Sequence, residues 1–259
     1  MLRIKNLRVW YTSRNKSQKE NTLAVDNVSL EISRGETLGL VGKSGSGKST
    51  IAWAAMGMMD HIGGECTGEI YLHGDSLLNQ PNAYRSILWK KIAMVPQAAM
   101  NSFNPVMKIG CSIKEVLKHH CPDLSSEERH IRCRELMELT QLPDEVLLYY
   151  PHQMSGGMKQ RAALAKALAC KPELLILDEA TTGLDVLTEA NLLKVVRRLQ
   201  REENMSMMFI SHDVRLVRSL CDRKIVLKDG KAVQDTDGYF KELIDNSYWI
   251  LPKGETAYA

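Results

Sequence analysis

The sequence predicts an α/β fold with a mostly parallel sheet, because short apolar runs alternate with helical patterns along its second half. Runs of strand length and the helical segments between them follow one another at 174–177, 188–203, 207–210, 213–220 and 224–227. This alternation is typical of parallel sheets, whose strands are joined by helices that cover both faces.

A second observation is a glycine-rich run that stands between a strand pattern and a helical pattern. The apolar run 37–41 is expected of a buried central strand, and 51–56 continues as a helix. Ahead of this unit, residues 2–11 and 25–32 have strand character, and the polar stretch 12–21 between them suits a loop.

A third observation is that strand patterns stop between about residues 98 and 153. Helix formers dominate 113–119 and 126–139, and Ser125-Ser126-Glu127-Glu128 is typical of a helix start. We therefore expect a helical lobe inserted into the α/β core. The segment from Asp245 onward is polar and aromatic without clear periodicity.

Composition and charge narrow the class of protein. The 259 residues carry a net charge of +3, with basic residues interspersed among acidic ones, so no nucleic-acid partner is expected. No apolar run approaches the ~18–20 residues that span a bilayer. Residues 1–5 lack the features of a signal peptide. We expect a chain that is soluble and cytoplasmic by itself, and that acts on a membrane only through a partner.

Six cysteines, at positions 66, 111, 121, 133, 170 and 221, show neither a CxxC pair nor regular spacing. A disulfide framework or a zinc site would need closer pairing, so we expect reduced and mostly buried thiols. The run His119-His120-Cys121 leaves a metal site open as an alternative, although the following Pro122 favours a helix end.

Residues 42–49 carry the strongest chemical signal, because they match G-x-x-x-x-G-K-[S/T] in full. Glycines let backbone N–H groups curl around phosphate oxygens, and the following helix directs its positive end at the same anion. The motif predicts that Lys48 reaches the β- and γ-phosphates of ATP and that the Ser49 hydroxyl binds Mg²⁺. The candidate nucleotide-binding residues here are Gly42, Lys43, Ser44, Gly45, Ser46, Gly47, Lys48, Ser49 and Thr50.

A second signal is the apolar run 174–177, which delivers Asp178 and Glu179 at its carboxyl end. Ligands of open α/β sheets bind at that end of the strands. Together with the glycine-rich loop, the run predicts that Asp178 holds Mg²⁺ through water. Glu179 is then placed to polarise the attacking water as a general base.

A third signal is Ser155-Gly156-Gly157 at the start of an alanine- and leucine-rich helix. Each glycine costs about 1 kcal/mol against alanine inside a helix, so helix propensity does not explain the pair. A helix start of this kind is an anion-binding end, whereas a loop with an N-cap is the alternative for the segment taken alone.

The order of these motifs resembles that of the nucleotide-binding subunits of ABC transporters. Ser155-Gly156-Gly157 is similar to the family's signature, and Gln97 to its Q-loop glutamine. Thr182-Gly183-Leu184-Asp185 is similar to the family's D-loop, and His212 to its switch histidine.

The resemblance implies the ABC ATPase fold, which is a P-loop NTPase core with a mostly parallel sheet, an N-terminal antiparallel β part and an inserted helical lobe. We expect one nucleotide-binding domain over residues 1–245 and a short tail over 246–259. Within the domain, the α/β core is expected at about 1–97 and 160–245 and the helical lobe at about 98–159.

The resemblance also implies roles for single residues. Tyr11 is similar to the aromatic residue that stacks on adenine, although a half-buried strand tyrosine is the alternative and Trp10 is a rival. Gln97 would contact Mg²⁺ and the attacking water, and His212 would hydrogen-bond the γ-phosphate and hold Glu179 in place. The implied catalytic residues are Glu179, His212 and Gln97, and the implied magnesium ligands are Ser49, Gln97 and Asp178.

The family pattern implies a head-to-tail dimer. Ser155, Gly156 and Gly157 would then contact the γ-phosphate held by the opposing subunit, and Asp185 would line the interface. The expected partners are a second ABC ATPase subunit (a paralogue or a second copy), two transmembrane permease subunits and an extracytoplasmic substrate-binding protein. Such partners would place the chain at the cytoplasmic face of the cell membrane.

Details of the motifs are similar to one branch of the family. Met158, where the signature usually has glutamine, and the stretch 101–106 are similar to subunits of peptide, opine and nickel importers. They favour a peptide, nickel or a metal chelate as cargo. Ala180 and Gly183 depart from the family pattern without removing a functional group, so activity is expected. The last cysteine is Cys221, so we expect no iron–sulfur cluster of the kind some subunits of this branch carry in a C-terminal extension.

Two other functions remain open at this point. A non-transport ATPase of the same family, acting in DNA repair or chromosome organisation, would insert a coiled coil or zinc modules into the helical lobe, and 98–159 has room for neither. A regulatory module that binds nucleotide without turnover would not need Glu179, Gln97 and His212.

Overall fold

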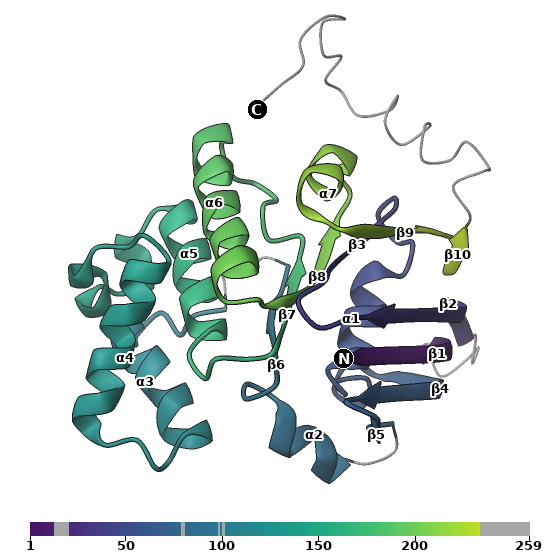
Figure 1. The fold of residues 1–259 in the computed structure, drawn as a ribbon, viewed down its shortest axis with the longest axis horizontal. Helices are drawn as coiled ribbons and strands as arrows, with labels where there is room; N and C mark the ends of the chain where they lie inside the picture. Colours follow the sequence, from purple (N-terminus) through teal and green to yellow (C-terminus); the bar gives the residue numbers. More distant parts are fainter. Residues whose placement is uncertain (13–20, 79–80, 98, 100–101, 234–259) are drawn as a thin grey trace, which may run out of the picture.

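The computed structural model describes residues 1–12, 21–78, 81–97, 99 and 102–233. Most of the loop predicted at 12–21, Asn101 and the whole predicted tail at 246–259 lie outside these residues. Two sheets and the helices packed on them make up the described fold (Figure 1).

The central sheet has the strand order β10-β9-β3-β8-β7-β6. Its strands are β3 (Thr37–Val41), β6 (Ile92–Val95), β7 (Leu174–Asp178), β8 (Ser206–Ser211), β9 (Arg223–Lys228) and β10 (Lys231–Val233). The pairs from β6 to β9 are parallel, whereas β10 pairs antiparallel with β9. Because parallel strands end at one edge, the residues that follow β3, β6, β7 and β8 are brought to the same side of the sheet.

The second sheet is antiparallel, in the order β2-β1-β4-β5. It consists of β1 (Leu2–Thr12), β2 (Asn21–Ile32), β4 (Gly64–Leu72) and β5 (Asp75–Ser76). Burial alternates along β1 but changes phase between Ile4 and Leu7, where the pairing with β2 also shifts register. An extra residue in one strand produces such a shift and lets apolar side chains on both sides of it face one core.

Seven α-helices of the described residues connect these strands. They are α1 (Lys48–Ala55), α2 (Pro81–Ile87), α3 (Ile109–His120), α4 (Ser126–Leu139), α5 (Gly156–Ala167), α6 (Val186–Glu202) and α7 (Val214–Leu220). The helices α3, α4 and α5 lie together to one side of the central sheet (Figure 1). None of the described helices combines the length and apolar character needed to cross a membrane.

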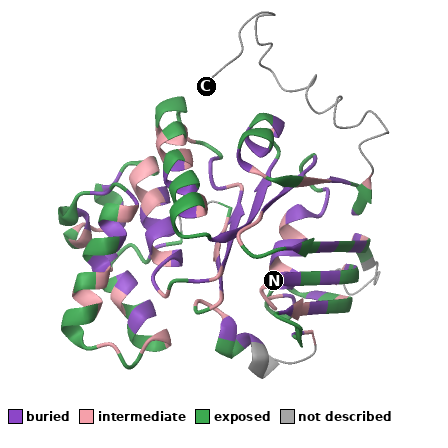
Figure 2. Cartoon of the chain, viewed as in Figure 1, coloured by how far each residue is buried: buried purple, intermediate pink, exposed green. Residues whose placement is uncertain are grey.

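The central sheet divides two apolar cores. Along β7, Leu175 and Leu177 belong to the core shared with α3–α6, whereas Leu174 and Ile176 belong to the core shared with α1 and the antiparallel sheet. This follows from the two-residue period of strand side chains. The central strands are accordingly buried throughout β3, β7 and β8 (Figure 2).

The predicted fold class is confirmed, and the predicted strands and helices of the second half form where the pattern indicated. The Ser125 side chain accepts the Glu128 N–H at 3.2 Å, and the Glu128 carboxylate accepts the Ser125 N–H at 2.7 Å, so α4 begins in a capping box. Patterns between 57 and 97 gave no prediction, and β4, β6 and α2 lie there. The division into core and lobe at 97/98 and 159/160 stays a prediction.

Candidate active site

The glycine-rich loop runs from the end of β3 into α1 and depends on backbone conformations that favour glycine. Gly45 and Gly47 have φ values of +80° and +97°, in the left-handed region that L side chains rarely adopt. At Gly42, a Cβ atom would lie 2.3 Å from the carbonyl oxygen of Leu227 in β9. The loop is therefore packed against the sheet at one end and left open at its exposed tip, residues 43–45.

Lys48 is a buried cation in the centre of this loop. Its Nζ donates to the carbonyl oxygens of Gly42 and Lys43, both at 2.8 Å, and lies 3.4 Å from the Ser46 hydroxyl. Burial lowers the pKa of the Lys48 ammonium, and the carboxylates of Glu179 and Asp178 counteract part of that shift. The loop thus encloses a positive charge that two carboxylates of the neighbouring strand end help to stabilise.

Asp178 ends β7 directly beside the start of α1. Its Oδ1 accepts a hydrogen bond from the Ser49 hydroxyl at 2.9 Å, and the residue is 1% exposed. Burial raises the pKa of Asp178 to about 6, against the opposing effects of the Ser49 hydrogen bond and the Lys48 charge. A hydroxyl and a carboxylate within hydrogen-bonding distance are the oxygen ligands that Mg²⁺ prefers, so this pair fits a magnesium ion.

Glu179 is the meeting point of three loops. The Gln97 amide, after β6, donates to its Oε2 at 2.9 Å, and Nδ1 of His212, after β8, lies 3.5 Å from its Oε1. The Thr182 hydroxyl lies 3.5 Å from Oε2. The Glu179 side chain is 11% exposed, whereas that of His212 is 57% exposed. The carboxylate is therefore held at the edge of the sheet, and the imidazole beside it is the more exposed of the two groups.

Tyr11 reaches this region from the antiparallel sheet. Its hydroxyl lies 3.3 Å from the Thr50 hydroxyl of α1, and the ring is half-buried. The contact joins the end of β1 to the first turn of α1. Stacking of Tyr11, or of its neighbour Trp10, on adenine stays a prediction.

Ser155 and Asp185 are the N-cap residues of two other helices, and their side chains bind N–H groups in the first turns of those helices. Ser155 caps α5 by accepting the Met158 N–H at 3.3 Å. Asp185 caps α6 by accepting the N–H and the hydroxyl of Thr188 at 3.0 and 2.6 Å, and these hydrogen bonds lower its pKa. At Gly157, a Cβ atom would lie 2.1 Å from the Thr188 methyl group, so the two helix starts are in contact.

Two features of the site escaped the sequence analysis. The sequence motif at 182–185 contains Thr182 but predicts no partner for it, whereas in the structure its hydroxyl lies near the Glu179 carboxylate. Thr188 was not singled out, although it stands three residues after the N-cap Asp185, where a capped N–H is expected. Its packing against Gly157 joins segments 31 residues apart, which no local pattern encodes.

Comparison with solved structures identifies the class of this site. The fold matches a dimeric structure of a post-hydrolysis state of the ATP-binding cassette MJ0796 bound to ADP and Pi, with a TM-score of 0.77 and 28% identity, over 90% of this chain and 97% of that one. A dimeric structure of MJ0796, a bacterial ABC transporter cassette, gives a TM-score of 0.76. The fold and the loop that encloses Lys48 define a P-loop nucleotide-binding protein.

The chain belongs to the ABC transporter family, whose model matches residues 25–182. It is 40% identical to the dipeptide transport ATP-binding protein DppD of Haemophilus influenzae, over 82% of this chain and 65% of that protein. It is 38% identical to the oligopeptide transport ATP-binding protein AppD of Bacillus subtilis, over 91% and 71%. It is 37% identical to the glutathione import ATP-binding protein GsiA of Escherichia coli K12, over 90% of this chain but 38% of that protein. The resemblance to importer ATPases found in the motifs is confirmed.

Proposed function

We propose that this chain binds ATP with Mg²⁺ and hydrolyses it as the energising subunit of a membrane importer. The observation that carries the proposal is the Glu179 carboxylate, held by Gln97 beside the Ser49–Asp178 pair at the end of the phosphate loop. A carboxylate in this place can orient and deprotonate the water that attacks the γ-phosphate. Mg²⁺ bound by Ser49 and Asp178 would neutralise charge on the phosphates.

The exposed starts of α5 and α6 belong, in this proposal, to the site of a second ATPase subunit. Ser155, Gly156 and Asp185 are exposed, and next to Asp185 the apolar side chains of Val186 and Leu187 are 80% and 72% exposed. Apolar side chains that exposed favour burial in an interface. The dimeric state of the MJ0796 structures supports the same arrangement.

An apolar groove beside the Gln97 segment fits a permease. It has a volume of about 360 Å³ and is lined mainly by apolar side chains: Trp53, Met56, Met58, Leu88, Trp89, Ala93, Met94, Pro96, Ser102, Ala163, Lys166 and Ala167. Pro96 directly precedes Gln97, which contacts Glu179. A helix seated in the groove would thus press on the segment that positions the carboxylate.

Lys166 indicates the chemistry of that helix. Burial lowers the pKa of its ammonium group, and its Nζ lies 5.6 Å from the centre of the ring of Phe103, the residue after Ser102. A carboxylate from a partner would stabilise this half-desolvated charge. We therefore assign the groove to a short amphipathic permease helix with apolar side chains on one face and one acidic residue near Lys166.

Peptides are the cargo that we propose, because the relatives are named for dipeptides, oligopeptides and glutathione. Nickel or a metal chelate, suggested by the motif details, is the alternative outcome of the test. An extracytoplasmic binding protein would deliver the cargo, and the chain would work at the cytoplasmic face of the membrane.

The test is transport by the complex that copurifies with this chain in detergent. The complex is reconstituted into vesicles with ATP on the side of this chain. It should take up labelled dipeptides and release phosphate, whereas Ni²⁺ should neither be taken up nor stimulate phosphate release. Uptake of Ni²⁺ alone would contradict the peptide assignment, and copurification of nucleic acid instead of membrane proteins would contradict the importer. Lys166→Glu should reduce the membrane proteins recovered, whereas Lys118→Glu, on the exposed side of α3, should not.

A further inference from the structure

Two half-buried thiols, Cys121 and Cys170, meet where α3 and α5 end. Cys121 caps the C-terminus of α3, and its N–H donates to the Leu117 carbonyl oxygen at 2.8 Å. Cys170 lies between α5 and β7, and its side chain is hydrogen-bonded to that of Cys121. Both pack against the same apolar core. The two sulfur atoms are therefore neighbours in a fixed place, although they are far apart in the sequence.

The segment that carries Cys170 is fastened to α4. The guanidinium of Arg132 donates to the carbonyl oxygens of Leu168 at 2.8 Å and Ala169 at 3.1 Å, which directly precede Cys170. Arg132 thereby satisfies carbonyl groups that the end of α5 leaves without partners in the helix. The connection between α5 and β7 is a joint between the helices and the sheet.

The residue before Cys121 contacts the sheet side of the same joint. The ring of its neighbour His120 lies 5.9 Å from that of Trp89, in the turn before β6. The chain beyond Cys170 continues into β7, whose last residue is Asp178. A covalent bond between the two sulfur atoms would therefore tie α3 to the strand that carries the candidate magnesium ligand.

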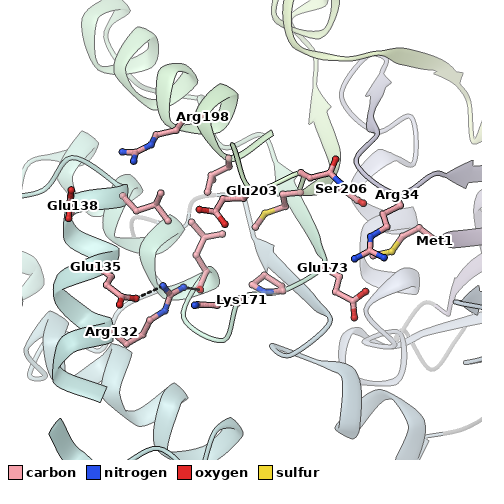
Figure 3. A pocket seen from close by; sticks show the side chains of 16 residues that line it. Met1, Arg34, Arg132, Glu135, Glu138, Lys171, Glu173, Arg198, Glu203 and Ser206 are labelled. Atoms are coloured by element: carbon pink, nitrogen blue, oxygen red, sulfur yellow. Dashed lines mark hydrogen bonds and ion pairs between the residues drawn. The ribbon is translucent and has the colours of Figure 1, made fainter. Parts of the chain in front are cut away.

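The joint borders a cavity of about 550 Å³ (Figure 3). Arg132 and Glu135 of α4 and Lys171 line one side of it, and Arg34 and Ser206 of the core line the other. Side chains do not fill the space between α4 and the sheet here, so the contact is not close-packed. The helices have room to shift relative to the sheet at this place.

A metal site does not explain the two thiols. Among the described residues, no group of three or more histidine, cysteine, aspartate or glutamate side chains is placed to hold a metal ion. His119 and His120 contact each other edge to face, with ring centres 4.8 Å apart, and His120 contacts Trp89. The pair is thus a dithiol, which is the arrangement that oxidises to a disulfide.

We propose that Cys121 and Cys170 form a dithiol switch, in which hydrogen peroxide produces a disulfide that ties α3 to the β7 segment and slows ATP turnover until a thiol reductant restores both cysteines. The braking effect rests on the proposed function, because it requires an ATPase cycle in which the helices move against the sheet. Formation of the disulfide itself does not.

The chemistry begins at Cys121. Burial raises the pKa of the Cys170 thiol to about 12, so that thiol stays protonated at neutral pH. The Cys121 thiolate attacks one oxygen of the peroxide, the O–O bond breaks, and the departing hydroxide takes up the proton that Cys121 released. The Cys170 sulfur then attacks the Cys121 sulfenic acid, the S–O bond breaks, and the Cys170 proton leaves with the hydroxide. Two thiols lose two electrons, one peroxide gains them, and two waters form.

Peptide mapping of the whole chain after peroxide treatment tests the disulfide. We expect a cross-linked peptide pair that contains Cys121 and Cys170, two hydrogens lighter than the separate peptides and restored by dithiothreitol. Cys170→Ser and Cys121→Ser should each abolish it. Cys66→Ser, a half-buried thiol in the antiparallel sheet, and Cys111→Ser, an exposed one on α3, should keep it. Absence of the pair in the parent chain would overturn the proposal.

Phosphate release by the complete complex tests the brake. Peroxide should lower the rate about tenfold, within the range typical of coupling between two sites, and the two serine variants should keep their rate. A cross-link that leaves the rate unchanged, or serine variants that lose activity to peroxide as the parent does, would overturn the brake. A complex that releases no phosphate before oxidation would contradict the proposed function and leave the mapped disulfide standing.

Discussion

The phosphate loop and the start of α5 are both glycine-containing segments that lead into a helix, but they are held in different ways. Lys48 and Ser49 are bound into the chain by hydrogen bonds to the loop carbonyls and to Asp178, and Lys48 is 4% exposed. Ser155 and Gly156 are exposed, and the Ser155 hydroxyl accepts a hydrogen bond from Met158, in the first turn of its own helix. One segment is the interior of a site, and the other is a surface.

Under the proposed function, the difference means that this chain contributes two unlike halves to two different nucleotide sites. The loop half contains Glu179, our proposed general base, which accepts a hydrogen bond from Gln97 at the neighbouring strand end. The α5 half is an exposed helix start at Ser155 and Gly156, which suits a phosphate presented by another subunit. The comparison predicts that a variant in the loop half affects this chain's own nucleotide, and that a variant in the α5 half affects the partner's.

The largest effect is expected for Glu179→Gln. Loss of the general base should lower phosphate release about 10²- to 10⁴-fold in the complex, because proton transfer of this kind contributes that much to a rate. ATP binding should persist, since Lys48 and Ser49 are intact, and the ATP-bound dimer should accumulate. Stopped-flow phosphate release and nucleotide retention measure both quantities.

The matched control is Glu173→Gln, because Glu173 pairs with His73 and directly precedes β7, at the end of the strand opposite to Glu179. It should release phosphate at the parent rate. Turnover by Glu179→Gln at the parent rate would refute the assignment of the base.

An intermediate effect is expected for Ser155→Ala. Loss of one donor to a transferring phosphate lowers a rate by up to about 10²- to 10³-fold. In a complex of two different ATPase chains, the loss should fall on the partner's site and leave ATP affinity at this chain's loop unchanged. Site-specific nucleotide cross-linking distinguishes the two sites.

Ser125→Ala is the control for helix stability. Ser125 caps α4 as Ser155 caps α5, so each variant should lose about 1 kcal/mol from a helix N-cap. Ser125→Ala should melt earlier by a similar amount and keep its turnover. Equal losses of turnover in both variants would mean that capping, and not contact with phosphate, explains the result.

The smallest effect is expected from pH. The folded pKa of Asp178 is about 6, raised from 3.8, so below pH 6 a proton competes with Mg²⁺ for this carboxylate. Magnesium affinity should fall by about tenfold per pH unit there. Without metal the sign for stability is opposite: the folded chain holds this proton more tightly than the unfolded chain, so the contribution of Asp178 to stability declines as pH rises from 3.8 through 6.

Titration calorimetry of Mg²⁺ with a bound ATP analogue, repeated from pH 5 to pH 8, measures the first effect. Asp178→Asn should bind Mg²⁺ weakly at every pH and lose the slope. A slope that persists in Asp178→Asn would assign the proton to another group.

Sequence patterns predicted the parts of the fold in which the local residue pattern alone specifies the backbone conformation. The buried run at 174–177 and the glycines at 45 and 47 each require one backbone conformation, and the structure has it. The patterns at 64–72 and 92–95 gave no signal: β4 has exposed residues through much of its middle, and β6 is four residues long. Short or half-exposed strands depend on their neighbours more than on their own sequence.

The site likewise contains residues that a local motif predicted and contacts that depend on the packing of distant segments. The loop, Asp178 and Glu179 were predicted because each follows a strand in a continuous motif. The contacts of Gln97, His212 and Thr182 with Glu179 depend on the order of β6, β7 and β8 in the sheet. The meeting of Cys121 with Cys170 depends on how α3 packs against α5. Neither arrangement is written in the spacing of residues along the chain.

Glu179 has a φ of +48°, a left-handed conformation that side chains other than glycine adopt at a cost of about 1–3 kcal/mol. Glycine at this position would relieve the strain and remove the carboxylate in the same step. Selection of random variants for thermal stability alone should therefore favour glycine at residue 179, which gives a more stable chain that no longer turns over ATP. Stabilising variants of this protein that change residue 179 therefore have to be screened for ATP turnover as well as for stability.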